Sequence, residues 1–332
     1  MSFVPLVEVL RNDRIESVHY GAWAVCDTKG KVINGRGDTQ IAFYLRSSAK
    51  PFQCATVVHL GTASRFQLSE AELAVVCASH GAEEIHLQNV LNILRKCGLD
   101  ETALQCGPHL PLHFPSQERV LRSGQKPLPI HNNCSGKHAG MLAACRHQNW
   151  RTDDYLSPDH PLQRANLATV AIFSGLNEKA IGVGTDGCGV PSYYLPLAHL
   201  ATAYARLANP DSLLRDWRGA AEMVVSSMCR HPRLVAYDGH FNTQLLEHLG
   251  HQVVAKGGAE GVFAVGIRGQ GLGFALKISD GTSRAIPPLV VALLEKLLPQ
   301  TKLDMLRRLA FAPLRNTRGE AIGAIRLARN AV

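Results

Sequence analysis

Alternating apolar and polar positions predict extended segments at both ends of the chain. Near the N-terminus, residues 17–26 predict a strand, residues 27–30 a turn and residues 31–33 the returning strand of an antiparallel hairpin. Residues 7–10 alternate weakly, and residues 39–44 form a further extended segment. The strands predicted near the C-terminus are residues 252–256, 261–268, 272–279 and 321–327, with a hairpin turn at residues 269–271.

Between these ends, the apolar positions follow the period of helices. A helix is predicted from Ser47 to Gly61, and Ser69 with Glu72 forms a capping box for the next one, over residues 71–79. Residues 106–136 are rich in proline and predict a loop, after which Ser135 is expected to cap another helix. The remaining predicted helices are residues 83–96, 158–174, 191–208, 211–229, 242–249 and 287–298, and a short strand is predicted at residues 180–184.

This arrangement predicts a mixed α/β (α+β) fold. Strands from residues of about 1–45 and 250–332 would form one antiparallel sheet flanked by helices, and residues of about 46–249 would form a mainly helical lobe beside it. No linker or internal repeat divides the sequence. We therefore expect residues 1–332 to form a single catalytic domain.

Composition narrows the class of protein. Of the 332 residues, 46% are hydrophobic and 19% are charged, which is typical of a globular protein with a sizeable core. The net charge of +8 comes from dispersed basic residues, so we expect no nucleic-acid partner, whereas an anionic or amino-acid substrate is compatible with it. The sequence has nine scattered cysteines, no signal-peptide pattern and no apolar run of membrane-spanning length, which indicates reduced thiols, a cytoplasmic location and no membrane partner.

Ser47 and Lys50 are the first candidates for chemistry. Three residues apart on a helix, they would share one face, with Cβ atoms roughly 5–6 Å apart. A neutral lysine at that distance can take the proton of a serine that attacks a carbonyl. The same spacing occurs by chance at Ser123 and Lys126, and the alternative is that Ser47 caps the helix while Lys50 is solvated.

Polar residues also stand at the edges of four other elements, where catalytic groups are often found. Ser79 follows a helix and Lys256 ends a strand, although each also has a purely structural explanation. Cys134 and Cys188 lie in glycine-rich turns with charged neighbours, and two thiolates brought together would suit zinc. Because 54 residues separate the two cysteines, spacing alone leaves this zinc site open.

Five motifs in order give the sequence a family resemblance. Over nearly its whole length the chain resembles the class 3, rhizobial-type L-asparaginases, also called the asparaginase II family. The motifs are Ser47-Ser48-Ala49-Lys50-Pro51-Phe52-Gln53, Cys77-Ala78-Ser79-His80, Asn133-Cys134-Ser135-Gly136-Lys137-His138, Asp186-Gly187-Cys188-Gly189-Val190-Pro191 and Lys256-Gly257-Gly258-Ala259-Glu260-Gly261.

The resemblance implies a fold similar to serine β-lactamases and penicillin-binding proteins (transpeptidase-like), hydrolysis of L-asparagine to L-aspartate and ammonia, and a homodimer. It also implies two serine–lysine pairs, Ser47 with Lys50 and Ser79 with Lys256. The zinc (Zn²⁺) ligands that it implies, with water completing the site, are Cys134, Lys137 and Cys188.

We therefore expect double-displacement hydrolysis of an amide. Ser47 would attack after losing its proton to a neutral Lys50, while Ser79 and Lys256 relay protons to the leaving nitrogen. Zinc is expected to have a supporting role. The expected substrate contacts are Arg46 with the carboxylate, Asp186 with the ammonium and His138 by a hydrogen bond, although Arg46 could equally be a surface charge.

Two other functions remain open from the sequence. One is a serine–lysine hydrolase of another amide, either β-lactamase-like or a peptidase. The other is a zinc-dependent binding protein without enzymatic activity, whose serines are structural. Release of ammonia from asparagine, compared with glutamine, would distinguish these functions.

Overall fold

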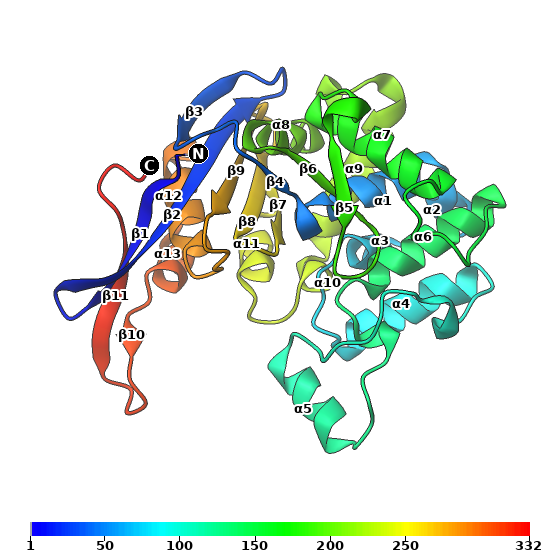
Figure 1. Ribbon diagram of the computed structural model, residues 1–332, viewed down its shortest axis with the longest axis horizontal. Coiled ribbons are helices and arrows are strands. Elements are labelled where there is room, and N and C mark those ends of the chain that lie inside the picture. Colours follow the sequence, from blue (N-terminus) through cyan, green and yellow to red (C-terminus); the bar gives the residue numbers. More distant parts are fainter. Residues whose placement is uncertain (1) are drawn as a thin grey trace.

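Strands from the two ends of the chain join in one eight-stranded antiparallel sheet (Figure 1). In the computed structural model, which describes residues 2–332, the strand order is β10-β11-β1-β2-β9-β8-β7, with β3 paired to β2. The strands are β1 (Val4–Arg11), β2 (Arg14–Asp27), β3 (Val32–Arg36), β7 (Val253–Gly258), β8 (Val262–Ile267), β9 (Leu272–Ile278), β10 (Leu314–Arg315) and β11 (Ala321–Leu327). The predicted sheet from both ends of the chain is confirmed.

Helices cover both faces of this sheet. α8 (Leu197–Ala208) packs against β9, β8 and β2, whereas α12 (Ile286–Leu297) contacts β1 and β11. Glycine lets α8 approach closely, because a Cβ on Gly266 would lie 2.2 Å from the carbonyl oxygen of Tyr204. All six residues of β8 are buried, as expected for a strand covered on both sides.

The middle of the chain forms the mainly helical half that the sequence predicts. Figure 1 shows these helices gathered to one side of the sheet, with α8 between the sheet and most of the others. They are α1 (Lys50–His59), α2 (Thr62–Arg65), α3 (Glu70–Val76), α4 (Glu84–Lys96), α5 (Phe114–Arg122), α6 (Ser135–Gln148), α7 (Pro161–Ser174), α9 (Arg215–Arg230), α10 (Pro232–Val235) and α11 (Phe241–Leu249). A last helix, α13 (Asp304–Ala310), packs against α12.

Three local predictions were wrong. The proline-rich segment contains α5, with Pro115 in its first turn, where a missing amide donor costs little. The first residues of the helix predicted at 191–208 instead form β6 (Pro191–Pro196), because they pair with β4 (Ala42–Tyr44) and β5 (Gly182–Thr185) in a small second sheet. Cys134, not Ser135, occupies the cap position of α6.

Two further observations concern the environment that the sequence suggested. All nine cysteines are free, in agreement with reduced thiols. Within residues 2–332, the helices are all too short or too polar to cross a bilayer.

Candidate active site

Four elements bring the two serine–lysine pairs to one place. Ser47 lies in the 3-10 turn η1 (Arg46–Ala49), Lys50 begins α1, Ser79 follows α3, and Lys256 lies on β7. The end of β7 packs against η1, where a Cβ on Gly258 would lie 2.8 Å from the carbonyl oxygen of Leu45. Glycine at this position therefore lets the strand that carries Lys256 reach the turn that carries Ser47.

The side chain of Lys50 does not bond to the side chain of Ser47, three residues before it. Its Nζ donates to the hydroxyl of Ser79 (3.1 Å) and to the carbonyl oxygens of Ala78 and Asn133. The backbone N–H of Lys50 donates to the backbone oxygen of Ser47, but among the described residues no hydrogen bond joins the two side chains. Three acceptors around a buried amine match the three protons of an ammonium, so this arrangement favours a charged Lys50 rather than the neutral one expected from the sequence.

Lys256 is the better base. Its Nζ lies 2.8 Å from Ser79 Oγ and 2.8 Å from the carbonyl oxygen of Gly257. Burial lowers the pKa of Lys256 well below its usual range, and the charge of Lys50 lowers this pKa further. A neutral Lys256 can donate to Gly257 and accept the proton of Ser79, which makes Ser79 the link between the two lysines.

A small cavity gives access to this cluster. Its volume is about 230 Å³, and Ser47, Ser79 and Lys256 line it. Ser47 and Ser79 are only half-buried, so a ligand in the cavity can reach both hydroxyls. The apolar part of the wall includes Leu112, Phe241, Phe263 and Ile286.

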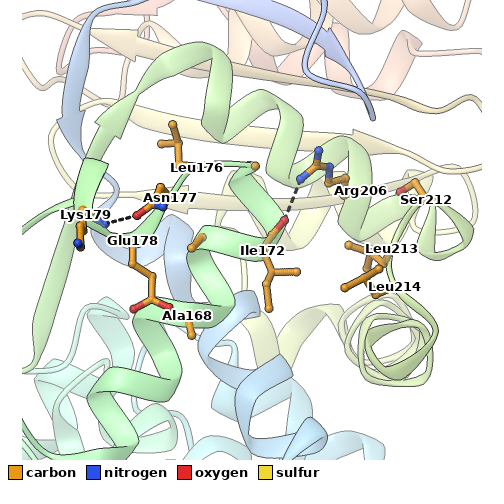
Figure 2. A pocket seen from close by; sticks show the side chains of 12 residues that line it. Ala168, Ile172, Leu176, Asn177, Glu178, Lys179, Arg206, Ser212, Leu213 and Leu214 are labelled. Carbon is orange, nitrogen blue, oxygen red and sulfur yellow. Dashed lines mark hydrogen bonds between the residues drawn. The ribbon is translucent and has the colours of Figure 1, made fainter.

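A larger cavity of about 760 Å³ lies elsewhere, between the end of α7 and the segment before α9 (Figure 2). None of its lining residues belongs to the five motifs. Ile172, Leu176 and Leu214 form part of its wall, and Arg206 there donates to the backbone oxygen of Ile172. Size alone therefore does not identify the reactive site.

Cys134, Lys137 and Cys188 meet in a second polar cluster. Lys137 Nζ donates to Cys188 Sγ at 3.0 Å, and all three side chains are buried. A hydrogen bond from Cys134, together with the charge of Lys137, lowers the pKa of Cys188 to about 5. The same hydrogen bond, together with burial, raises the pKa of Cys134 to about 12. Burial by itself would lower the pKa of Lys137. The negative charge of the two neighbouring thiol groups has the larger effect, and the pKa lies above the ordinary value of a lysine.

The donor set fits the zinc site that the resemblance implies. Two thiols and an amine converge, the pKa of the Cys188 thiol is lowered to about 5, and sulfur and nitrogen are atoms that Zn²⁺ prefers. Within residues 2–332, no three His, Cys, Asp or Glu side chains form a metal cluster by themselves. A zinc ion here would need Lys137 as its third protein ligand, and this amine would have to lose a proton when the metal binds.

The three expected substrate contacts lie beside this cluster. Arg46 Nε donates to Asp186 Oδ1 at 2.7 Å, so these two residues pair with one another. Burial raises the pKa of Asp186, but Lys137 and Arg46 lower it below its ordinary value. His138 Nδ1 lies 2.7 Å from Tyr155 Oη, while His138 Nε2 is buried and has no partner among the described residues.

Packing of α6 on α3 places this second cluster. A Cβ on Gly136 would lie 2.2 Å from the carbonyl oxygen of Val75, so only glycine allows the first turn of α6 to approach α3. Lys137 and His138 follow directly on this turn. Close packing of α6 on α3 thus explains why glycine stands between Cys134 and Lys137, which the motif alone does not reveal.

Sequence reasoning missed three residues of the site. Asn133 accepts from Lys50 through its backbone oxygen, and it stood inside a quoted motif. Tyr155 orients His138 from a loop that carries no motif. His240 lines the cavity from the residue before α11, and only the tertiary structure brings it there.

One family model matches nearly the whole chain. Residues 7–327 match the family described as L-asparaginase II. Solved structures of similar shape include the native form of a protein called Mglu, with 16% identity and a TM-score of 0.48. The match covers 84% of this chain and 64% of Mglu, so the chain spans less than two thirds of that protein's length. A β-lactamase from Mycobacterium bovis is also similar (14% identity, TM-score 0.44), over 84% of this chain and 94% of the β-lactamase.

No curated protein gives a significant match to the sequence. The family match extends over almost all of the chain and includes all five motifs. The chain therefore belongs to the L-asparaginase II family.

Proposed function

We propose that this protein hydrolyses L-asparagine to L-aspartate and ammonia through a serine ester. The observation that carries the proposal is the hydroxyl of Ser79, held between Lys50 and Lys256 in a cavity that Ser47 also lines. Family membership supports an amide of small size as the substrate.

In the first half-reaction, Ser47 Oγ attacks the carbon of the side-chain amide. The proton of Ser47 passes through Ser79 to the neutral amine of Lys256, as the oxygen–carbon bond forms. Lys256 then returns a proton through Ser79 to the leaving nitrogen, the carbon–nitrogen bond breaks, and ammonia departs. Water attacks the remaining ester by the reverse path, which releases L-aspartate and restores the Ser47 hydroxyl.

Lys50 contributes a fixed charge in this scheme. It is buried and donates to Ser79, so it stabilises negative charge that develops on the Ser79 oxygen during the relay. The same charge helps to keep Lys256 neutral. The role of base, which the sequence suggested for Lys50, thus passes to Lys256.

Arg46, Asp186 and His138 remain our candidates for binding the amino-acid end of the substrate. Arg46 uses Nε for Asp186 and has Nη1 4.0 Å from Glu260 Oε1, so Nη2 is the nitrogen that it can offer to a carboxylate. Asp186 Oδ1 accepts from Arg46 and from the amide of Gly187, which leaves Oδ2 for an ammonium. The unpartnered Nε2 of His138 is a third position for a hydrogen bond.

Cys134, Lys137 and Cys188 are our candidates for holding a zinc ion. When bound, the ion would supply positive charge near the substrate and hold the two thiolates together, which is a supporting role. We further propose a cytoplasmic homodimer, whose mass can be measured by light scattering.

The experiment that tests this function is ammonia release from L-asparagine by the purified protein, with L-glutamine and nitrocefin as alternative substrates. We expect turnover of L-asparagine that is lost in Ser79→Ala. Efficient nitrocefin hydrolysis without ammonia release would identify a β-lactamase-like enzyme instead. No turnover of any of the three substrates would contradict the proposed function.

A further inference from the structure

Three histidines share one backbone arrangement, but only one of them has a free ring nitrogen at the active-site cavity. In His80, His160 and His240, Nδ1 accepts the backbone N–H of the residue two positions later, at 3.2, 3.1 and 3.1 Å. Nε2 of His80 lies 2.8 Å from Ser135 Oγ, and Nε2 of His160 lies 3.1 Å from the backbone oxygen of Arg151. Within residues 2–332, Nε2 of His240 has no hydrogen-bond partner, which sets this histidine apart.

His240 lies where a ligand would reach it. It caps the N-terminus of α11 and lines the same cavity of about 230 Å³ as Ser47, Ser79 and Lys256. Its ring packs edge-on against Tyr237, with centroids 4.8 Å apart, and this contact together with the cap holds the ring in place. The cap therefore leaves Nε2 as the ring nitrogen available to a ligand.

The cap also determines which nitrogen carries the proton. Burial lowers the pKa of His240 to about 4, and the nearby Lys256 contributes, so the ring is neutral at neutral pH. A neutral imidazole has one donor and one acceptor, and Nδ1 must be the acceptor because it receives the N–H of Asn242. The proton is thus on Nε2, and the ring presents a hydrogen-bond donor to the cavity.

We propose that His240 donates its Nε2–H to an oxygen of the bound amide substrate and so positions it against the serine–lysine cluster. This inference rests on the proposed amidohydrolase function and adds a binding residue that belongs to none of the five motifs. The acceptor is either the amide oxygen or a carboxylate oxygen, and kinetics distinguish them. A donor to the amide oxygen acts mainly on kcat, whereas a donor to the carboxylate acts mainly on KM.

The main test compares His240→Asn with His160→Asn in the full-length protein. Asparagine is a good capping residue and keeps the acceptor for the i+2 amide, but its side chain is too short to replace Nε2. We expect kcat/KM for L-asparagine to fall at least tenfold in His240→Asn and to change less than twofold in His160→Asn. In His240→Gln, whose side-chain amide can reach the position of Nε2, we expect partial recovery.

A second measurement does not depend on turnover. Nitrogen-15 NMR of the histidine rings should show His240 protonated on Nε2, with its signals identified by their loss in His240→Asn. Addition of L-aspartate should shift the Nε2 signal of His240 and leave that of His160 unchanged.

The outcomes separate this inference from the proposed function. An active wild-type enzyme with unchanged kcat and KM in His240→Asn would overturn the role of His240 alone. A wild-type protein that lacks amidohydrolase activity but shifts the His240 signal with L-aspartate would overturn the function and support the contact. Protonation on Nδ1, or L-aspartate binding without a shift, would overturn the contact.

Discussion

Lys50 and Lys256 share a single hydroxyl. Their Nζ atoms lie 3.1 Å and 2.8 Å from Ser79 Oγ, although the two lysines are 206 positions apart in the sequence and lie on a helix and a strand. Two buried amines this close cannot both be charged without a large cost. Their contacts differ accordingly, with three hydrogen-bond partners around the Lys50 amine and two around that of Lys256.

Lys256→Met should remove the base and lower kcat by about 10²–10⁴-fold, the usual contribution of general acid–base catalysis. In the wild-type enzyme, kcat should fall as the pH drops through the lowered pKa of Lys256, because the protonated amine cannot accept a proton. Steady-state ammonia release over a pH series measures both effects. A Lys256→Met enzyme with wild-type kcat would refute the assignment.

The same substitution has a predictable effect on stability. In the unfolded chain, Lys256 has the ordinary lysine pKa of about 10.4, whereas in the folded protein its pKa is lowered. At pH values between the folded pKa and about 10, the unfolded state therefore binds more protons than the folded state. The free energy of unfolding of the wild type rises with pH over this range. Lys256→Met lacks this dependence. Its Tm minus the wild-type Tm should therefore be greatest at low pH and shrink as the pH approaches 10.

The matched control is Lys179→Met, since Lys179 is exposed. Its difference in Tm from the wild type should stay constant across the same pH range. A Lys256→Met difference that is equally constant would show that Lys256 is charged in the folded protein.

Ser47→Ala and Ser79→Ala should both lose activity, but for different reasons. If Ser47 is the nucleophile, the wild-type enzyme quenched during turnover should carry a substrate ester on the peptide that contains Ser47, whereas Ser79→Ala, which lacks the relay for both half-reactions, should carry little or none. Mass spectrometry after rapid acid quenching detects this ester. Ser123→Ala, which removes the serine of the accidental serine–lysine spacing at the exposed end of α5, should remain fully active.

An ester found on Ser79 in the Ser47→Ala variant would reverse these two roles. Lys256 would then be the direct base for the attacking hydroxyl. This result would leave the proposed overall reaction intact.

Gly136→Ala should destabilise the fold far more than Gly219→Ala. The new Cβ of Gly136→Ala would lie 2.2 Å from Val75 O, and such overpacking typically costs about 1–3 kcal/mol. Gly219 lies in α9 with no atom within 4 Å of its Cβ position, so alanine there should stabilise by about 0.5–1 kcal/mol. Urea unfolding measures both, and equal effects would contradict the tight α3–α6 contact.

Zinc content tests the second cluster without reference to activity. The purified protein should hold about one zinc per chain, and Cys134→Ser or Cys188→Ser should lose it, since each removes a sulfur ligand. Cys229→Ser serves as control, because Cys229 lies outside the cluster and donates to Val253 O. Equal metal content in all four proteins would exclude this site.

If zinc only supports the pocket, a chelated protein should keep a measurable kcat with a raised KM. Complete loss of kcat that returns on adding zinc would instead indicate a direct role in the chemistry.

Local signals predicted most of the fold. The capping box of Ser69 and Glu72 forms as expected, and the hairpin of β2 and β3 has the predicted turn, because both depend on neighbouring residues alone. β6 was mistaken for helix because its conformation depends on pairing with β4. The α5 helix was missed because proline, counted as a helix breaker, stands where helices tolerate it.

The site was predictable in its members and less so in its bonds. The order of the motifs predicted both serine–lysine pairs. The spacing of Ser47 and Lys50, however, suggested a hydrogen bond between their side chains that does not form. The amine of Lys50 instead reaches acceptors 28 and 83 positions away, which no local pattern contains. His240 was missed for the same reason.

The joining of the two chain ends in one sheet also governs when the enzyme can become active during its synthesis. β1 and β2 can pair with one another, and β2 with β3, as soon as they are made, but the other edge of β1 has to wait for β11 and that of β2 for β9. Lys256 arrives on β7, among these late segments. A nascent chain that carries Ser47, Lys50 and Ser79 but not yet β7 would therefore lack the base of the proposed mechanism.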